Sequence, residues 1–70
     1  MSVVFRIELE RETDGRWTAE VVELPGVLAY GVTQDDAIAR VQALALRVVA
    51  DRLENDDAGR EFLNISFAAA

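Results

Sequence analysis

The sequence predicts an α+β domain in which three strands, one long helix and a fourth strand follow one another, an order written βββαβ. Three observations predict it. Apolar and polar side chains alternate along several short stretches, as they do in half-buried strands. Apolar residues recur at helical spacing from Gln34 to about Asn55, and turn residues separate these stretches. The 70 residues suffice for one small domain, 1–70.

The first two strands are expected to form a hairpin. Alternation predicts the first strand over Val3–Arg11 and the second over 17–23. Between them lies Asp14-Gly15, a pair that hairpins favour because both residues accept a positive φ. Trp17 has the parity of the inner face, so we interpret it as a core anchor packed on the helix rather than as a platform for a stacked ligand.

A tight turn and a short third strand precede the helix. Pro25 presets φ and Gly26 tolerates positive φ, so the pair predicts a turn. The third strand is then expected over Val27–Tyr30, and Gly31 ends it. The two glycines before a helix N-terminus also suggest a phosphate loop, but their spacing fits neither the P-loop nor the dinucleotide motif. The turn is therefore the preferred interpretation.

The long helix is expected to begin after Thr33, whose hydroxyl can cap the first amides. Asp36 stands where a capping box places glutamate, and the helix dipole favours acidic residues there. Projected along the helix, the apolar residues span an arc of about 200°, roughly twice what a surface helix needs. One sheet face cannot cover this arc, which consists of Ile38, Val41, Leu44, Ala45, Leu46, Val48, Val49 and Leu53.

Residues 55–59 are expected to end the helix and to form the connection to the last strand. Their pair Asp56-Asp57 lacks the number of ligands that calcium needs, so a plain loop is preferred over a cation site. Alternation from Glu61 to Phe67 predicts the fourth strand, and the three alanines that follow are expected to fray. Its expected inner side chains are Leu63, Ile65 and Phe67, and its outer ones Phe62, Asn64 and Ser66.

The connections predict the sheet topology. A helical crossover returns the chain to its starting end, so the fourth strand must run parallel to the first. Right-handed crossover and sequential pairing of the first three strands predict the order 3-2-1-4. The helix then covers one face of the sheet, and the other face stays open.

The composition excludes several classes of function. The chain has 13 acidic and seven basic residues, a formal net charge of −6, and neither histidine nor cysteine; all seven basic residues are arginine. It therefore lacks the common general base, the thiol nucleophile and the catalytic lysine, and we predict no cofactor. An acidic chain does not suit nucleic acid but suits a basic partner. No apolar run approaches a membrane span and no signal-peptide pattern begins the chain, so a cytoplasmic protein is expected.

Three glutamates on the open face were weighed as a metal site. Glu8, Glu10 and Glu20 have the parity of that face, and three carboxylates there resemble the metal-binding set of RNase H-type nucleases. However, Arg6 and Arg11 lie among them, and no acid on the last strand completes the set. We therefore prefer a solvated, charge-paired sheet face, and predict no metal and no catalytic residue.

A second copy of the chain is the expected partner for the wide apolar helix. Seventy residues without disulfides bury a small core, so a homo-oligomer, most simply a two-fold dimer, is predicted. The short apolar edge strand containing Tyr30 offers a second surface for self-association. The candidate interface residues are Tyr30, Leu46, Val49 and Leu53.

These motifs together resemble the signature of the HicB-like antitoxin family, over about residues 3–55. The resemblance implies a partial RNase H-like fold. It also implies a bacterial or archaeal protein that neutralises HicA, a small basic toxin that resembles double-stranded-RNA-binding domains and cleaves mRNA. The residues that carry it are Asp14, Gly15, Trp17, Ala19, Val21, Leu24, Pro25, Gly26, Val27, Gly31, Thr33, Asp36, Ala37 and Ile38.

The sequence departs from the family pattern in a few places. Val22 stands where many members have proline, Val27 where many have cysteine, and Asp36 where glutamate is usual. Many members also append a DNA-binding segment, and this sequence ends after the fourth strand, so operator binding is not expected of it.

The leading functional prediction is a non-catalytic, antitoxin-like module that binds a small basic toxin of the HicA type. The alternative is a stand-alone, oligomeric HicB-like domain with a regulatory or ligand-binding role and no toxin partner. A neighbouring reading frame for a short basic protein with a lone histidine would separate these two. An RNase H-like nuclease is disfavoured because the carboxylate set is incomplete.

Overall fold

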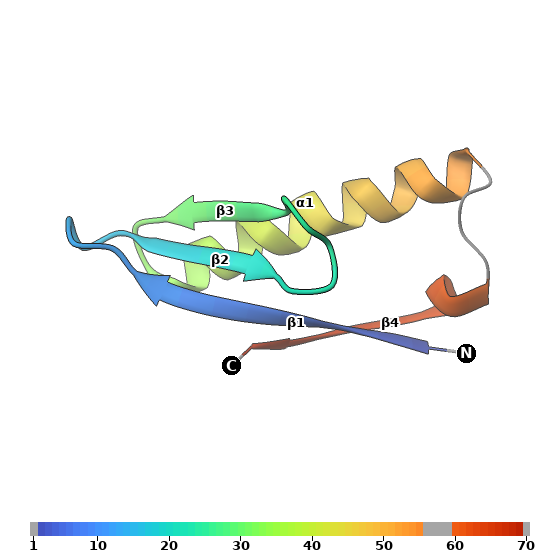
Figure 1. Cartoon of the computed structure of the whole chain (residues 1–70), viewed down its shortest axis with the longest axis horizontal. Coiled ribbons are helices and arrows are strands. Elements are labelled where there is room, and N and C mark those ends of the chain that lie inside the picture. Colours follow the sequence, from blue (N-terminus) through green and yellow to red (C-terminus); the bar gives the residue numbers. More distant parts are fainter. Residues whose placement is uncertain (1, 56–59, 70) are drawn as a thin grey trace.

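The computed structural model of the chain describes residues 2–55 and 60–69. Its α+β class and its βββαβ order confirm the prediction (Figure 1). The elements are, in chain order, β1 (Ser2–Arg11), β2 (Trp17–Val21), β3 (Leu28–Gly31), α1 (Gln34–Glu54), a short 3-10 helix (Arg60–Leu63) and β4 (Asn64–Ala69). The predicted loop with Asp56-Asp57 lies outside the described residues.

The four strands form one sheet in the order β3-β2-β1-β4, which confirms the predicted topology. β1 pairs antiparallel with β2, β2 pairs antiparallel with β3, and β4 runs parallel to β1. The helix α1 crosses behind one face of the sheet and lies nearest to β3 and β2 (Figure 1). No described helix covers the other face, so the sheet has the predicted open side.

The second and third strands are shifted relative to their predicted bounds. β2 was expected to reach Glu23 but ends at Val21. There the Val21 carbonyl accepts a hydrogen bond from the Leu24 amide at 3.1 Å, and the Leu24 carbonyl accepts one from the Val27 amide at 3.0 Å. The chain therefore already turns at residues 22 and 23, before the Pro25-Gly26 pair, and β3 starts one residue later than predicted.

The predicted fourth strand, Glu61–Phe67, is wrong in its first half. Arg60–Leu63 forms a 3-10 helix, so the alternation that suggests a strand does not apply there. Phe62 packs against the core, with its ring centroid 6.3 Å from that of Phe5, whereas Leu63 is 72% exposed. The two residues therefore have the opposite orientations to those predicted.

The end of β4 is longer than predicted. Ala68 pairs with Arg6 and Ala69 pairs with Ile7, so these two alanines belong to the strand and do not fray. Backbone pairing needs no large side chain, and β1 begins at Ser2, which leaves it long enough to pair with β4 up to Ile7. Ala70 lies outside the described residues.

The core lies between the sheet and α1. Phe5 and Ile7 of β1 are each 1% exposed, which confirms the inner face predicted for that strand. Trp17 is half-buried and packs against the core, as expected of an anchor. The buried residues are Phe5, Ile7, Ala19, Val21, Leu24, Val27, Ala37, Val41, Ala45 and Val49.

Only part of the apolar arc of α1 is fully buried. Its fully buried residues recur at every fourth position: Ala37, Val41, Ala45 and Val49. Val49 is only 4% exposed, so it belongs to the core of its own chain and cannot contribute to the candidate interface. Leu46 and Leu53 remain 48% and 50% exposed, so the helical part of that interface reduces to these two leucines.

The start of α1 is capped as predicted. The Thr33 hydroxyl accepts a hydrogen bond from the Asp36 amide at 3.1 Å, and the Asp36 carboxylate accepts one from the Val32 amide, also at 3.1 Å. In a usual capping box the side chain at this position accepts a hydrogen bond from the amide of the N-cap residue, here Thr33. Asp36 instead accepts one from the amide of the preceding residue, Val32. Two free amide groups at the helix end are thereby satisfied.

Two substitutions test this turn and cap. Thr33→Ala is expected to lower the free energy of unfolding by about 1 kcal/mol, because the Asp36 amide loses its acceptor. Gly26→Val is expected to cost about 2 kcal/mol, because Gly26 has a φ of 86° that a β-branched residue adopts only with strain. Urea denaturation measures both. Neutral effects of both changes would contradict this description of the element.

Candidate functional site

The side of the sheet opposite α1 presents a surface that no described element covers (Figure 1). Side chains alternate along each strand, so every second residue of β1, β2 and β3 points to it. Thr18 is half-buried and the other side chains are exposed. We define the open sheet face by the residues Val4, Arg6, Glu8, Glu10, Thr18, Glu20, Leu28 and Tyr30.

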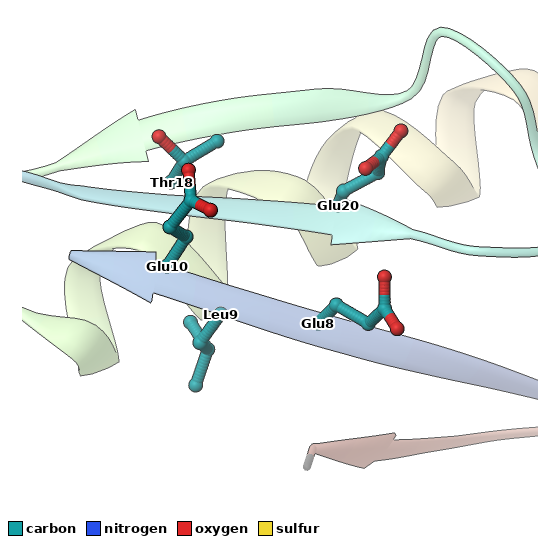
Figure 2. Close-up of a pocket in the computed structure, with 5 residues that line it drawn as sticks. All are labelled: Glu8, Leu9, Glu10, Thr18 and Glu20. Carbon is teal, nitrogen blue, oxygen red and sulfur yellow. The ribbon is translucent and has the colours of Figure 1, made fainter. Parts of the chain in front are cut away.

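The centre of the open sheet face is a shallow hollow over β1 and β2, lined by Glu8, Leu9, Glu10, Thr18 and Glu20. Figure 2 shows the three carboxylate groups on the same side of the two strands, whereas the Leu9 side chain points the other way. The Thr18 hydroxyl donates a 2.6 Å hydrogen bond to the Glu12 carboxylate. The hollow is therefore rimmed by carboxylates and is suited to cationic groups.

The register of the hairpin places two of these glutamates directly opposite each other. Glu8 of β1 pairs with Glu20 of β2, and Glu10 pairs with Thr18 in the same ladder. Like charges at directly opposite positions of an antiparallel pair destabilise a sheet. The free chain therefore keeps an unfavourable charge pair at the centre of its open sheet face.

The charge pairing of this face differs in its partners from the one that the sequence suggests. Arg6 forms its ion pair with Glu23, at 2.7 Å between Nε and Oε2, and Arg11 lies over the Trp17 ring at 5.9 Å from its centroid. Among the side chains that the structure describes, none forms an ion pair with Glu8, Glu10 or Glu20. Hydrogen bonding to Glu23 and, more weakly, the charge of Glu8 raise the pKa of Arg6, so Arg6 compensates the charge of Glu8 in part.

Hydrogen bonds lower the pKa of three carboxyl groups outside the hollow. The Arg6 side chain lowers the pKa of Glu23, the Arg40 side chain lowers that of Asp36, and the Arg16 backbone amide lowers that of Asp14. In each case the hydrogen bond stabilises the charged form of the carboxyl group.

These shifts predict a loss of stability in acid. A carboxyl group with a lowered pKa in the folded state adds stability above its ordinary pKa, and this is lost as the pH falls through the folded value. We expect urea unfolding to show lower stability at about pH 3 than at about pH 7, with the loss beginning near the ordinary carboxyl pKa of about 4. Glu23→Gln should reduce this loss. An unchanged pH dependence in that variant would show that the Arg6–Glu23 pair does not contribute.

The structure does not assemble a metal site from the described residues. Among residues 2–55 and 60–69, no group of three or more acidic side chains is placed to hold a metal ion. Glu8, Glu10 and Glu20 share a face but do not converge on one point (Figure 2). The arrangement offers negative charge and solvent access, which are the properties of a surface for a cationic partner.

The β3 edge has a different electrostatic character. Tyr30 is 47% exposed, and the Arg16 guanidinium lies 5.3 Å from its ring centroid. A shallow groove beside β3 is lined by Ala29, Tyr30, Arg40, Ala43, Leu44 and Arg47. Arg40 is paired with Asp36 at 3.1 Å. This edge is therefore flanked by arginines in an otherwise acidic chain.

The residues whose pattern resembles the HicB-like signature have structural roles, and none of them lines the hollow. Gly15 and Gly26 have φ values of 92° and 86° in turns, the Asp14 carboxylate accepts a hydrogen bond from the Arg16 amide, and Thr33 caps α1. Gly31 and Ala37 are buried where β3 passes into α1. The signature residues with the most specific structural requirements are Asp14, Gly15, Trp17, Pro25, Gly26, Gly31, Thr33, Asp36 and Ala37.

No family model matches the chain, and no match to it was found among curated proteins or solved structures. The function must therefore be argued from the open sheet face and its chemistry. Within the described part of the chain, no helix has both the length and the apolar character needed to cross a membrane.

Proposed function

We propose that this chain is a non-catalytic, antitoxin-like module that binds a small basic RNA-cleaving protein of the HicA type through its open sheet face. The observation that carries the proposal is that Glu8, Glu10 and Glu20 lie on one uncovered surface and belong to none of the ion pairs among the described side chains. The resemblance of the sequence to HicB-like antitoxins supports it, and a partial RNase H-like fold and a cytoplasmic location are parts of the same proposal.

The like-charge pair supports a cationic partner on energetic grounds. Glu8 and Glu20 lie opposite each other in the free chain, at a cost of a few tenths to about 1 kcal/mol. A lysine or arginine of the partner placed between them would remove this repulsion. Charge complementarity would also accelerate association and favour basic partners over acidic ones.

Apolar side chains beside the hollow supply the rest of the surface. Leu28 and Tyr30 of β3 are 37% and 47% exposed, and Val4 of β1 is 49% exposed. Aromatic and aliphatic anchors contribute more to affinity than exposed ion pairs do. The open sheet face thus combines a charged centre with apolar side chains around it, as a protein-binding surface requires.

Inhibition would follow from competition with RNA. A protein that cleaves RNA needs a basic surface to hold the phosphate backbone. An acidic face that covers this surface excludes RNA without any chemistry of its own, so the module needs no metal and no cofactor.

The proposal is tested with the short basic protein encoded by a neighbouring reading frame. We expect the two purified proteins to form a complex in size-exclusion chromatography, and RNA cleavage by the basic protein to stop once the chain is added in equal amount. Failure of the two proteins to associate, with cleavage undiminished at an excess of the chain, would contradict the proposal.

The chain itself is expected to have no hydrolytic activity. It lacks histidine, cysteine and lysine, and its described carboxylates do not converge. Incubation with RNA and with an RNA–DNA hybrid, in magnesium or manganese, should leave both intact. Cleavage that disappears in Glu8→Gln and Glu20→Gln variants would instead identify a nuclease.

The alternative function is a stand-alone oligomeric domain with a regulatory or ligand-binding role. Leu46 and Leu53 support it, because both side chains remain about half exposed on α1. A chain that assembles with itself and binds no basic protein would favour this alternative.

A further inference from the structure

The outer edge of β4 is a long strand edge without charge. β4 pairs with β1 on one side only, and no described strand pairs with its other side. In the sheet it lies on the side of β1 away from β2 and β3, and it crosses β1 in the view of Figure 1. Its six residues, Asn64–Ala69, include no charged residue and no proline. Edge strands usually carry such residues because they prevent pairing with another chain.

The side chains next to this edge are also incompletely covered. Ile65 and Phe67 point to the inner side and are only partly buried, and Leu63 is 72% exposed just before the strand. The helix α1 lies nearest to β3 and β2, the two strands on the far side of β1. The inner side chains of β4 are therefore only partly covered within the chain.

The other candidate surfaces suit a second copy less well. Two-fold pairing through β3 would bring together two grooves that each carry Arg40 and Arg47, so like charges would meet. Each copy also has a formal net charge of −6, so two copies repel each other unless they meet where charge is absent. The uncharged β4 edge fulfils this condition.

We propose that two copies of this chain pair antiparallel through β4, about a two-fold axis perpendicular to the sheet, and form one continuous eight-stranded sheet. Residues that lie directly opposite each other in an antiparallel pair point to the same face of the sheet. The two-fold axis must therefore pass where one residue lies opposite its own copy, and not midway between two successive residues. Centred on Ser66, the pairing places Ile65 of each copy opposite Phe67 of the other, an aliphatic–aromatic pair that sheets favour.

This geometry has a functional consequence that rests on the proposed function. An axis perpendicular to the sheet keeps both helices on one side and both open sheet faces on the other. The dimer would therefore display two hollows with Glu8, Glu10 and Glu20 on the same surface, and would bind two basic partners at once.

The pairing is tested by charge substitutions at Ser66, which lies exposed on β4. Wild-type protein should sediment as a dimer at tens of micromolar. Ser66→Glu and Ser66→Lys should each weaken self-association by about tenfold or more, because like charges then meet at the axis. An equal mixture of the two variants should dimerise again, since opposite charges meet. This recovery also shows that both variants are folded.

The control is Ala50→Glu, which places a charge at an exposed position of α1 outside every candidate interface and should leave the dimer intact. A wild-type monomer, or a dimer that Ser66 variants leave unchanged, would overturn the proposal. Variants that fail to dimerise even when mixed would also overturn it. If the mixing experiment confirms the dimer but the wild-type protein binds no basic protein, the proposed function is refuted and the pairing is not.

Discussion

Replacing Gly31 with alanine is expected to lower the free energy of unfolding by about 3 kcal/mol, the upper range for overpacking. An added Cβ would lie 2.8 Å from the Ala37 Cα and 2.9 Å from the carbonyl carbon of Asp36. Both are backbone atoms of the first turn of α1, so the whole helix start would have to move away from β3. Urea denaturation of the isolated chain measures the effect.

Gly26→Ala is the matched control for this substitution. Gly26 has a φ of 86°, but an added Cβ would meet no atom within 4 Å. Its cost is therefore limited to the backbone conformation, about 1 kcal/mol. Equal losses in the two variants would show that the close approach of β3 and α1 is not the constraint that makes Gly31 necessary.

Glu20→Arg is expected to weaken binding of the basic partner by about 100-fold, because like charges across an interface cost several kcal/mol. In the free chain the same change places an arginine opposite Glu8, so the isolated protein should become more stable by up to about 1 kcal/mol. Calorimetric titration measures the first effect, and urea denaturation the second.

The control is Glu54→Arg, which makes the same charge change in the last turn of α1, far along the chain from the hollow. It should leave the affinity close to that of the wild type. If both variants weakened binding equally, the partner would respond to net charge alone and the open sheet face would not be its binding site.

Most of the fold could be predicted from local patterns. The alternation in β1 correctly placed Phe5 and Ile7 in the core, because a strand has a period of two residues. Thr33 correctly marked the start of α1, because few residue types can cap a helix. The sheet order followed from the length and hand of the connections.

The failures arose where two local structures share one pattern. Leu63 continues the apolar alternation of Ile65 and Phe67 as a strand residue does, yet it belongs to a 3-10 helix together with Phe62. Which of them is buried depends on the position of the Phe5 ring, a contact across more than fifty residues of sequence. Val49 was similarly misplaced, because the helix periodicity shows that a residue is apolar but not which of two surfaces it meets.

The sequence predicts which residues form the candidate site but not how their charges are paired. Parity placed Glu8, Glu10 and Glu20 on the open face, but it could not show which arginines neutralise them. Arg6 is engaged by Glu23, which the turn after β2 brings back beside β1. The Arg6–Glu23 pair could be predicted from the sequence only if the register of the β1–β2 hairpin were known. The same register sets Glu8 opposite Glu20.

The most direct test of the open sheet face as a binding surface is carbon-13 NMR of the glutamate carboxyl groups, recorded before and after addition of the basic partner. We expect the carboxyl signals of Glu8, Glu10 and Glu20 to shift, because cations of the partner approach them. The signals of Glu23, already paired with Arg6, and of Glu54 on α1 should stay in place. Formation of a complex in which the signals of Glu8, Glu10 and Glu20 do not move would contradict the proposed binding surface.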